Sequence, residues 1–426
     1  MNTNVVVIGA GASGLKLVKQ LSKYHGIDVT LVDKNSRHVW KPLMHEVATG
    51  IRDDRVDAVN LRYHSVKNGY QFIQGEVCSI DNKSNNIKLL SVKDQNQREI
   101  IPERVISFDI LVIAIGSKTN DFGNSDVSKY CYYINDLDTA LLSKNKLQNE
   151  IERNHFFGEK ETKVTIVGGG ATGVELAANI VNSVDKLNMN GFCSTNAQGL
   201  KITVLEGGER ILPNLDKDVA DYIYNSLIRL NVTIKTKTIA SEIKKDGVVT
   251  QDGDFIDHDV IFWTAGIKCP SFLSKIEGLE TNKINQITTN ANLIAKNSQN
   301  IFVIGDAANC VDSNGFAVPA TAQSAHQMAD ACLRNILSLI RREKLVDFEY
   351  KDHGAIVKLN KESTAGSLVT PFKRKNFTNS FIVNSITSTL YGAHIISILG
   401  YRKGIVNLLY GKFSQFSGNN IDFFSV

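Results

Sequence analysis

A glycine-rich motif opens this chain: Gly9-Ala10-Gly11-Ala12-Ser13-Gly14 follows the apolar run from Val5 to Ile8. The motif recurs as Gly168-Gly169-Gly170-Ala171-Thr172-Gly173, after the run from Val164 to Val167. In each copy the first glycine permits a tight turn, the second lets the backbone approach a pyrophosphate, and the third lets the following helix pack closely on the strand. The phosphates would lie at the helix N-terminus, so two dinucleotide sites are predicted.

Each motif is followed by a second apolar strand that ends in an acid. The run from Val29 to Val32 precedes Asp33, and the run from Ile202 to Leu205 precedes Glu206. A carboxylate at such a strand end can accept hydrogen bonds from a ribose diol. Two glycine-rich turns in an ordinary α/β sheet are the alternative. Because strand, glycines, helix, strand and acid occur in this order twice, we predict an α/β fold with two Rossmann-like dinucleotide-binding domains.

Composition fits a folded chain of two to three domains. The 426 residues carry a net charge of +4 with 22% charged residues, which is too mild a balance to indicate a nucleic-acid partner. The six cysteines lie far apart, without a CxxC pair or metal-ligand spacing, so neither a disulfide scaffold nor a metal site is expected. The first strand begins almost at the initiating methionine, so we expect no signal or transit peptide.

Apolar runs outline the domains. The first unit closes with residues 110–115, and the second opens near Asn120 and closes with residues 260–263. A later run at 301–304 precedes Gly305 and Asp306, and a helix over about 320–340 is assigned to the first unit. The polar stretch 186–199 is predicted to be a surface loop. We predict one domain formed by 1–118 and 264–345, a second formed by 119–263, and a C-terminal domain at 346–426.

Two acids favour particular ligands. Asp306 follows a late strand in a Gly-Asp pair, where its carboxylate can bind the ribityl chain of a flavin; a helix-capping role is the alternative. Glu206 can accept from the free 2′-hydroxyl of NADH but would repel the 2′-phosphate of NADPH. Glu209 adds a second acid nearby, and Arg210 is a neighbouring cation. NADH with incomplete discrimination against NADPH is therefore predicted.

The chain resembles two-dinucleotide flavoprotein reductases, and most closely the type II NADH:quinone oxidoreductases. Beyond the two fingerprints, the resemblance is carried by Trp40-Lys41-Pro42-Leu43-Met44-His45-Glu46-Val47-Ala48-Thr49-Gly50, by residues 109–120, 263–267 and 302–308, and by Ala322-Gln323-Ser324-Ala325-His326-Gln327. The chain departs from the family at Lys41, where a small hydroxyl residue is common, and in its reduced aromatic content at the C-terminus. The resemblance implies a glutathione-reductase-like arrangement with a membrane-docking C-terminal segment.

The resemblance also implies that the first unit binds FAD and the second binds NADH. The residues expected at FAD are Gly9, Gly11, Ala12, Ser13, Gly14, Asp33, Lys34, Lys41, Pro42, Leu43, Val77, Ala114, Gly116, Asp306 and Ala322. Those expected at NADH are Gly168, Gly170, Ala171, Thr172, Gly173, Glu175, Glu206, Ala265 and Gly266.

Two residues are expected at the chemistry itself. Glu175 is predicted on the first turn of the second fingerprint helix, and the resemblance places it near the nicotinamide and the flavin; a helix-stabilising acid is the alternative. Gln323 matches a glutamine at the family's quinone pocket; the alternative is that it caps or packs the helix beginning near Thr321. We assign both as catalytic candidates.

The predicted reaction passes a hydride from NADH to FAD and then two electrons to a quinone, without proton pumping. Three alternatives remain open. A sulfide:quinone oxidoreductase would need a pair of redox cysteines, for which Cys131 and Cys310 are conceivable, and a dithiol reductase would need a CxxC motif. A flavin-binding NADH sensor with slow turnover is the third.

The C-terminal segment is predicted to bind a membrane surface. Residues 376–401 contain no Asp, Glu, Lys or Arg, with basic residues on both sides, but polar residues interrupt them. Residues 405–416 place Ile405, Leu408, Leu409, Phe413 and Phe416 at helical spacing. Such amphipathic helices with basic borders lie in the headgroup plane, and a core or dimer helix is the alternative. We expect a monotopic homodimer, at the cytoplasmic face of the inner membrane if the source is bacterial.

Overall fold

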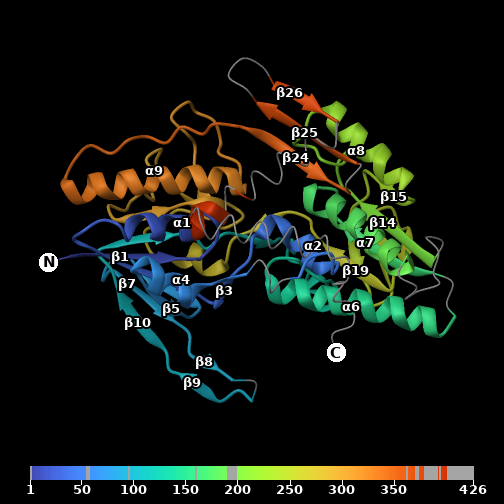
Figure 1. The fold of residues 1–426 in the computed structure, drawn as a ribbon, viewed down its shortest axis with the longest axis horizontal. Coiled ribbons are helices and arrows are strands. Elements are labelled where there is room, and N and C mark those ends of the chain that lie inside the picture. Colours follow the sequence, from blue (N-terminus) through green and yellow to red (C-terminus); the bar gives the residue numbers. More distant parts are fainter. Residues whose placement is uncertain are drawn as a thin grey trace.

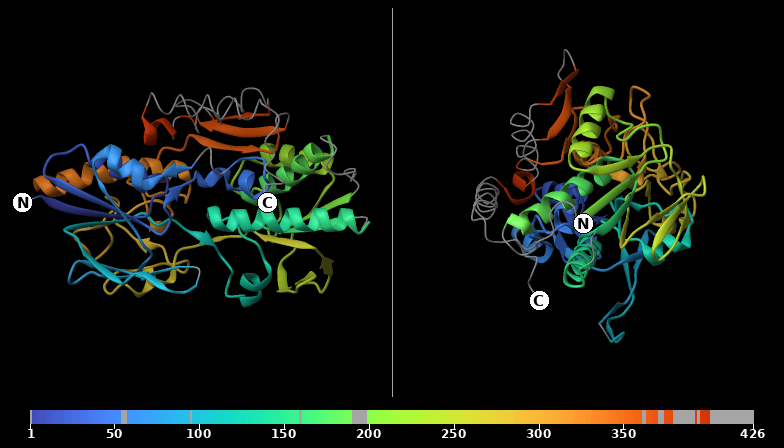
Figure 2. Two further views of the ribbon diagram at one scale, coloured as in Figure 1. Left: turned by 60° about the horizontal axis from the view of Figure 1, so that its bottom comes forward. Right: turned by 90° about the vertical axis from the view of Figure 1, so that its right-hand side faces the viewer.

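The computed structural model describes residues 2–400 except for 54–57, 95, 159–160, 190–198, 361–362, 370–373, 379–391 and 393–394. Two α/β halves lie side by side along the long axis (Figure 1). A three-stranded sheet lies on one side of them, and two small antiparallel sheets lie on the opposite side (Figure 2). Most of the predicted loop at 186–199 and most of the predicted amphipathic helices fall outside the described residues.

The first half contains a parallel sheet in the order β22-β11-β1-β2-β5. Its strands are β1 (Thr3–Ile8), β2 (Ile27–Asp33), β5 (Gln71–Gln74), β11 (Ile110–Ile113) and β22 (Ile301–Val303). Helices α1 (Ala12–Leu21) and α9 (Ala322–Arg341) pack against each other, and α4 (Leu61–Asn68) precedes β5. Strands β1, β2, β11 and β22 are rich in Val and Ile and mostly buried, as expected for a parallel sheet covered on both faces, whereas the edge strand β5 is only partly buried. Because β22 pairs with β11, the chain returns to the first sheet after crossing the second half.

The second half contains a parallel sheet in the order β15-β14-β13-β19. Its strands are β13 (Thr162–Val167), β14 (Leu200–Leu205), β15 (Val232–Lys235) and β19 (Val260–Trp263). Its helices are α5 (Ser125–Tyr130), α6 (Leu137–Phe156), α7 (Ala171–Met189) and α8 (Lys217–Arg229). The crossing between halves is made by β12 (Lys118–Thr119) and β20 (Ile267–Lys268), which pair antiparallel.

Smaller elements complete both halves. The antiparallel strands are β6 (Val77–Asp81), β7 (Asn86–Leu89), β8 (Val92–Lys93), β9 (Glu99–Ile101) and β10 (Arg104–Ser107) in the first half, and β16 (Ala240–Ile243), β17 (Gly247–Thr250) and β18 (Phe255–Asp257) in the second. The short pairs are β3 (Arg37–His38) with β4 (Val59–Asn60), and β21 (Ile287–Thr288) with β23 (Ala308–Asn309). Short 3-10 helices in the described residues include η1 (Lys41–Leu43), η3 (Ser271–Lys275) and η4 (Gly305–Ala307). The β8–β9 hairpin projects away from the body (Figure 1).

A short helix of the first half inserts its side chains into the core of the second. This helix, α2 (Met44–Ala48), packs against α6 and α7. Met44, Val47 and Ala48 belong to the same apolar cluster as Ile166 and Val174 of the second half. The segment beside the predicted flavin site is therefore fixed by both halves.

The described part of the C-terminal region begins with a sheet that the sequence analysis did not predict. Strands β24 (Gly354–Lys358), β25 (Thr364–Val369) and β26 (Arg374–Phe377) form an antiparallel sheet that packs on α7 and α8. The prediction was incomplete because it followed helical spacing and missed the short β-branched run before Lys358. One helical turn, 395–399, follows in the described residues. Nowhere in the described chain is a helix both long and apolar enough to cross a membrane.

Candidate functional site: two nucleotide sites joined by one strand

The two fingerprint turns have the same backbone geometry. Gly9 has a φ of +103°, and Gly168 has a φ of +115°, values that favour glycine. A Cβ on Gly9 would lie 2.4 Å from the carbonyl oxygen of Ala114, and one on Gly168 would lie 2.8 Å from the backbone nitrogen of Ala265. Each turn is therefore pressed against the chain that leaves a neighbouring strand.

The other glycines of the two motifs differ in how closely neighbouring atoms surround them. A Cβ on Gly14 would lie 1.9 Å from the Gly9 carbonyl oxygen, and one on Gly173 would lie 1.9 Å from that of Gly168. By contrast, a Cβ on Gly11 would meet its nearest atom only at 3.9 Å. Gly11 caps α1 without a side-chain hydrogen bond, and the first turn of α1 has no acid. The backbone N–H groups at the N-terminus of α1 are therefore suited to bind a diphosphate, in agreement with the predicted FAD site.

The acids at the two strand ends bind the fingerprint turns themselves. Asp33 accepts hydrogen bonds from the backbone N–H groups of Ala10, at 2.6 Å, and Asn35, at 2.7 Å. Glu206 accepts from the N–H groups of Gly169 and Gly208, both at 2.7 Å. Burial raises the pKa of Asp33, and the two backbone hydrogen bonds oppose that shift. Both carboxylates thus order the turns beside which a ribose would bind.

Most predicted FAD residues gather at the carboxyl ends of β1, β2, β11 and β22, where open α/β sheets bind ligands. The Ser117 hydroxyl donates to the Asp306 carboxylate at 2.7 Å, and Lys41 donates to the Ser117 carbonyl at 2.8 Å. The remaining positions are Ala114 and Gly116 just after β11, Pro42 and Leu43 in η1, Val77 at the start of β6 and Ala322 at the start of α9. Lys34 instead forms an ion pair of 2.8 Å with Asp136, the N-cap of α6.

The predicted NADH residues gather at the carboxyl ends of β13, β14 and β19. The Thr264 hydroxyl donates to the carbonyls of Val167 and Gly168, at 3.0 and 3.1 Å. This fixes the start of the 264–266 turn against the fingerprint. Gly266 has a φ of +64°, and a Cβ there would lie 2.8 Å from the Phe122 ring. Ala171 and Thr172 open α7, whose N-terminus faces the same edge of the sheet.

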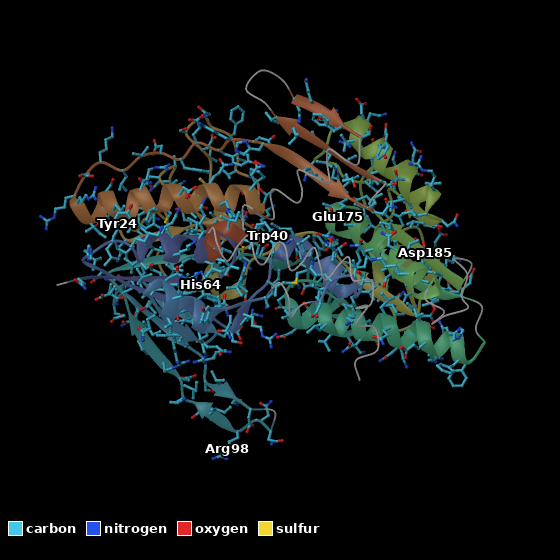
Figure 3. All side chains as sticks on the ribbon, viewed as in Figure 1. Tyr24, Trp40, His64, Arg98, Glu175 and Asp185 are labelled. Atoms are coloured by element: carbon cyan, nitrogen blue, oxygen red, sulfur yellow. The ribbon has the colours of Figure 1, made fainter. Side chains whose placement is uncertain are left out.

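Glu175 lies one turn later than predicted. Because α7 begins at Ala171, its first turn contains no acid, and Glu175 follows as the fifth helical residue. Its carboxylate accepts a 3.0 Å hydrogen bond from the backbone N–H of Lys358 and lies 3.7 Å from Nδ1 of His45. Figure 3 shows Glu175 on the side of the second half that faces Trp40.

Gln323 is the second residue of α9, next to its Thr321 cap. The side-chain Nε2 donates to the carbonyl of Gly354 at 3.2 Å, and Oε1 accepts from the N–H of His353 at 2.8 Å. Trp40, from the segment before η1, meets the His326 ring of the same helix edge-on, with centroids 5.7 Å apart. The start of α9 is therefore packed against both the 40–50 segment and the chain entering β24.

Strand β24 joins the two catalytic candidates, a connection that sequence reasoning missed. Its first residue, Gly354, binds Gln323 of α9, and its last residue, Lys358, binds Glu175 of α7. Four residues of extended chain span about 13 Å. The signal for this strand was Ala355-Ile356-Val357 after a glycine, but only tertiary structure indicates that its two ends reach different halves.

The described cysteines form no redox pair. Cys131 belongs to an apolar cluster of the second half, whereas Cys310 belongs to the core of the first. Burial raises the pKa of Cys131 to about 12 and also raises that of Cys310. These thiols remain protonated and lie in separate cores, which gives the sulfide-oxidoreductase alternative no support.

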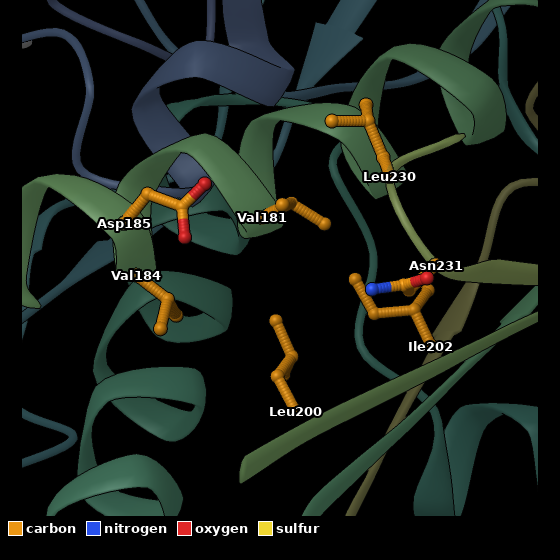
Figure 4. A pocket seen from close by; sticks show the side chains of 7 residues that line it. All are labelled: Val181, Val184, Asp185, Leu200, Ile202, Leu230 and Asn231. Atoms are coloured by element: carbon orange, nitrogen blue, oxygen red, sulfur yellow. The ribbon is translucent and has the colours of Figure 1, made fainter. Parts of the chain in front are cut away.

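Two hollows lie away from the fingerprint turns. One, of about 10 Å³, has room for no more than a single water and is lined by Val181, Val184, Asp185, Leu200, Ile202, Leu230 and Asn231 (Figure 4). A shallow groove of about 280 Å³ runs across the beginnings of β13 and β14 and includes Lys163 and Lys201. Neither contains a predicted site residue.

Sequence comparison places the chain in a known family. The family model for pyridine nucleotide-disulphide oxidoreductases matches residues 3–329. A type II NADH:quinone oxidoreductase of Haemophilus influenzae is 35% identical over 395 residues, which cover 88% of this chain and 89% of that protein. A type II NADH:quinone oxidoreductase of Staphylococcus aureus is 26% identical over 372 residues, covering 85% of this chain and 89% of that protein.

Solved structures share the fold. NDH2 from Plasmodium falciparum, determined in complex with NADH, superposes with a TM-score of 0.82 at 19% identity, covering 99% of this chain and 100% of that one. The sulfide:quinone oxidoreductase of Aquifex aeolicus gives a TM-score of 0.73 at 18% identity, covering 93% and 92%. With its two dinucleotide sites and its relatives taken together, this chain belongs to the type II NADH:quinone oxidoreductase family.

Proposed function

We propose that this FAD-dependent NADH:quinone oxidoreductase binds FAD on the five-stranded sheet and NADH on the four-stranded sheet. FAD supplies the chemistry that accepts a hydride from NADH and passes two electrons to a quinone. The observation that carries the proposal is strand β24, which is bonded to Glu175 beside one nucleotide site and to Gln323 beside the other. The domain boundaries proposed are 1–118 with 264–345 for FAD, 119–263 for NADH, and 346–426 for the C-terminal region.

Each half has a defined binding task. At the FAD site, the α1 N-terminus would hold the diphosphate and Asp306 would meet the ribityl chain, with Lys41 close by through Ser117. At the NADH site, the α7 N-terminus would hold the diphosphate and Glu206 would lie beside the adenosine ribose. Because Glu206 already accepts from two N–H groups, its remaining lone pairs are those available to ribose hydroxyls.

Gln323 and Glu175 would act on the quinone side. An amide has two N–H donors, and within the described residues Gln323 uses one of them, toward Gly354. The second can donate to a quinone carbonyl, which gains negative charge as it is reduced, so the bond would strengthen in the transition state. Glu175, whose side chain is 15% exposed, lies at the junction of α7, α2 and β24, where a carboxyl can hold or release a proton.

Steady-state kinetics test the overall function. The purified, FAD-loaded protein is expected to reduce a short-chain quinone with NADH, with higher kcat/KM than with NADPH and no reduction with sulfide. Sulfide-dependent quinone reduction without NADH turnover would instead favour the alternative reaction. NADH oxidation that stays slow with every quinone would favour the sensor.

The C-terminal segment is proposed to attach the enzyme to a membrane surface as a monotopic homodimer. The helical turn 395–399 is fixed to the first half, where Ile398 is fully buried in the main core. Lys19, His64 and Lys67 donate in order to the carbonyls of Ser397, Ile398 and Leu399. The two lysines bring positive charge to this end of the helix, which complements its dipole. The described chain thus ends beside α1 and α4, and the proposed cytoplasmic location applies if the source is bacterial.

A further inference from the structure

A second carboxylate, Glu46 of α2, lies in the same buried region as Glu175. Glu46 is only 6% exposed. Its Oε2 pairs with Nε of Arg52 at 2.7 Å, and its Oε1 lies 3.9 Å from Nζ of Lys358. Lys358 also gives its backbone N–H to Glu175. Two acids and two cations, from α2, the loop after it, α7 and β24, therefore lie close together between the halves.

The charges that face Glu175 come from every element packed around it. Helix α2 contributes His45 and Glu46, the loop after α2 contributes Arg52, and β24 contributes Lys358. His45 is not a cation at neutral pH, because burial lowers its pKa to about 4. The two cations therefore differ in their surroundings: Arg52 is bonded to Glu46 and its side chain is 13% exposed, whereas the Lys358 side chain is 39% exposed.

We infer that Glu46 acts together with burial to keep Glu175 protonated at neutral pH: its fixed negative charge, held beside Glu175 through the shared Lys358, disfavours a second carboxylate there, and Arg52 and Lys358 limit that effect. Glu46 remains ionised because the Arg52 pair and Lys358 outweigh its own burial, holding its pKa near 2. Among the described residues, no Arg or Lys side chain forms an ion pair with Glu175. Burial and the charge of Glu46 raise the pKa of Glu175 to about 8, against the opposing effect of Lys358.

Glu46 thus acts on the protonation of Glu175 through its charge, whereas Glu175 itself would exchange a proton. Reduction of a quinone to a quinol consumes two electrons and two protons. If the proposed function holds, Glu175 could supply one of these protons to a quinone oxygen and regain it from water, with the other taken from solvent. Only the transfer of a proton from Glu175 to a quinone rests on the proposed function. The protonation state of Glu175 can be measured without turnover.

The arrangement predicts pKa changes of opposite sign. Glu46→Gln removes the negative charge and leaves two cations near Glu175, so the pKa of Glu175 should fall. Arg52→Gln leaves Glu46 uncompensated, so the pKa of Glu175 should rise, and Lys358→Gln should raise it as well. Changes on the order of one pH unit in the titration midpoint are expected for charged neighbours in a largely buried site. Glu46→Asp, which keeps the charge, should restore most of the original value.

Infrared spectroscopy measures this directly on the full-length, FAD-loaded protein without NADH or quinone. The C=O band of a protonated carboxyl is titrated with pH and assigned to Glu175 by its loss in Glu175→Gln. The matched control is Glu103→Gln, which breaks an exposed pair with Lys88 far from the site and should leave the midpoint unchanged. FAD content and melting temperature verify folding of each variant.

The expected result is an acid shift for Glu46→Gln and alkaline shifts for Arg52→Gln and Lys358→Gln. Equal midpoints, or shifts in the same direction for all three, would overturn the inference. Should Glu46→Gln not fold, the Lys358→Gln and Glu46→Asp midpoints decide it, since the first must rise and the second must stay near the original. Opposite shifts in a protein that lacks NADH:quinone turnover would support the inference while rejecting the proposed function.

Discussion

The carboxylate of Glu175 accepts a 3.0 Å hydrogen bond from the backbone N–H of Lys358. This bond joins the helix of the second fingerprint to a strand that follows the FAD half in sequence. Because the other end of the same strand binds Gln323, the spacing between the two catalytic candidates depends on β24. The site is therefore a product of chain segments that are distant in sequence.

Cofactor preference should depend on Glu206. Glu206→Ala is expected to lower kcat/KM for NADH, because charge-assisted hydrogen bonds to the ribose are lost. The loss should correspond to about 1.5 to 3 kcal/mol of transition-state stabilisation. NADPH should be affected less, since its 2′-phosphate is repelled by the native acid. The control is Glu209→Ala, which removes an exposed acid paired with Lys237. An unchanged NADH/NADPH ratio in Glu206→Ala would falsify the assignment.

Gln323→Leu should separate the two half-reactions. Flavin reduction by NADH is expected to stay within a few-fold of normal, whereas reoxidation by quinone should slow by about one to two powers of ten. Stopped-flow traces of both steps measure this. Gln327→Leu is a matched control, because Gln327 binds the backbone of Lys351 one turn further along α9, with bonds of 2.8 and 3.0 Å.

If Gln323 serves only to hold β24, its loss should resemble the loss of Gln327, with lower stability and no selective effect on quinone. A variant slowed chiefly in the NADH step would contradict the proposed quinone position.

The largely buried Glu175 should make the stability of the protein depend on pH. Its pKa rises from 4.5 to about 8 on folding, mainly through burial. Between these values the folded state binds more protons than the unfolded state, so this residue makes the protein progressively less stable as pH rises. Glu175→Gln removes that penalty, which amounts to at most about 1.4 kcal/mol of unfolding free energy for each pH unit between the two pKa values.

Melting temperatures of native and Glu175→Gln proteins at pH 5 and pH 8 provide the measurement. The melting temperature of Glu175→Gln, relative to that of the native protein, should be higher at pH 8 than at pH 5. A constant difference across this range would mean that Glu175 is ionised in the folded state throughout.

A chain ending at Gly400 tests the membrane proposal. This cut keeps Ile398 in the core and the three donors on the 395–399 carbonyls, so FAD binding should be retained. The cut removes the amphipathic stretch 405–416 but keeps 376–400, so binding to anionic lipid vesicles and activity with a long-chain quinone should weaken, while a short-chain quinone is still reduced. High salt should release the full chain only in part. Full-length protein that stays in solution beside anionic vesicles would contradict surface attachment.

Local sequence patterns predicted both nucleotide folds because their determinants are local. The glycines at Gly9 and Gly168 serve the turn in which they occur, and the acids Asp33 and Glu206 follow directly after buried strands. The β24 sheet was missed because its pairing and its contacts with α7 and α8 arise between distant segments. Glu46 was missed as a charge partner for the same reason.

Lys34 illustrates a further limit. The sequence places it beside Asp33 at the FAD site, but its ammonium reaches Asp136 on the other half. A basic residue at a strand end has several acids within reach, and only the packing of the two halves selects one of them.

Anaerobic titration of the FAD-loaded protein tests the central claim most directly. Adding a stoichiometric amount of NADH should bleach the flavin absorbance, and adding a short-chain quinone without oxygen should then restore it fully. Flavin that NADH does not bleach, or bleached flavin that quinone does not reoxidise, would contradict the claim that this chain passes electrons from NADH through FAD to a quinone.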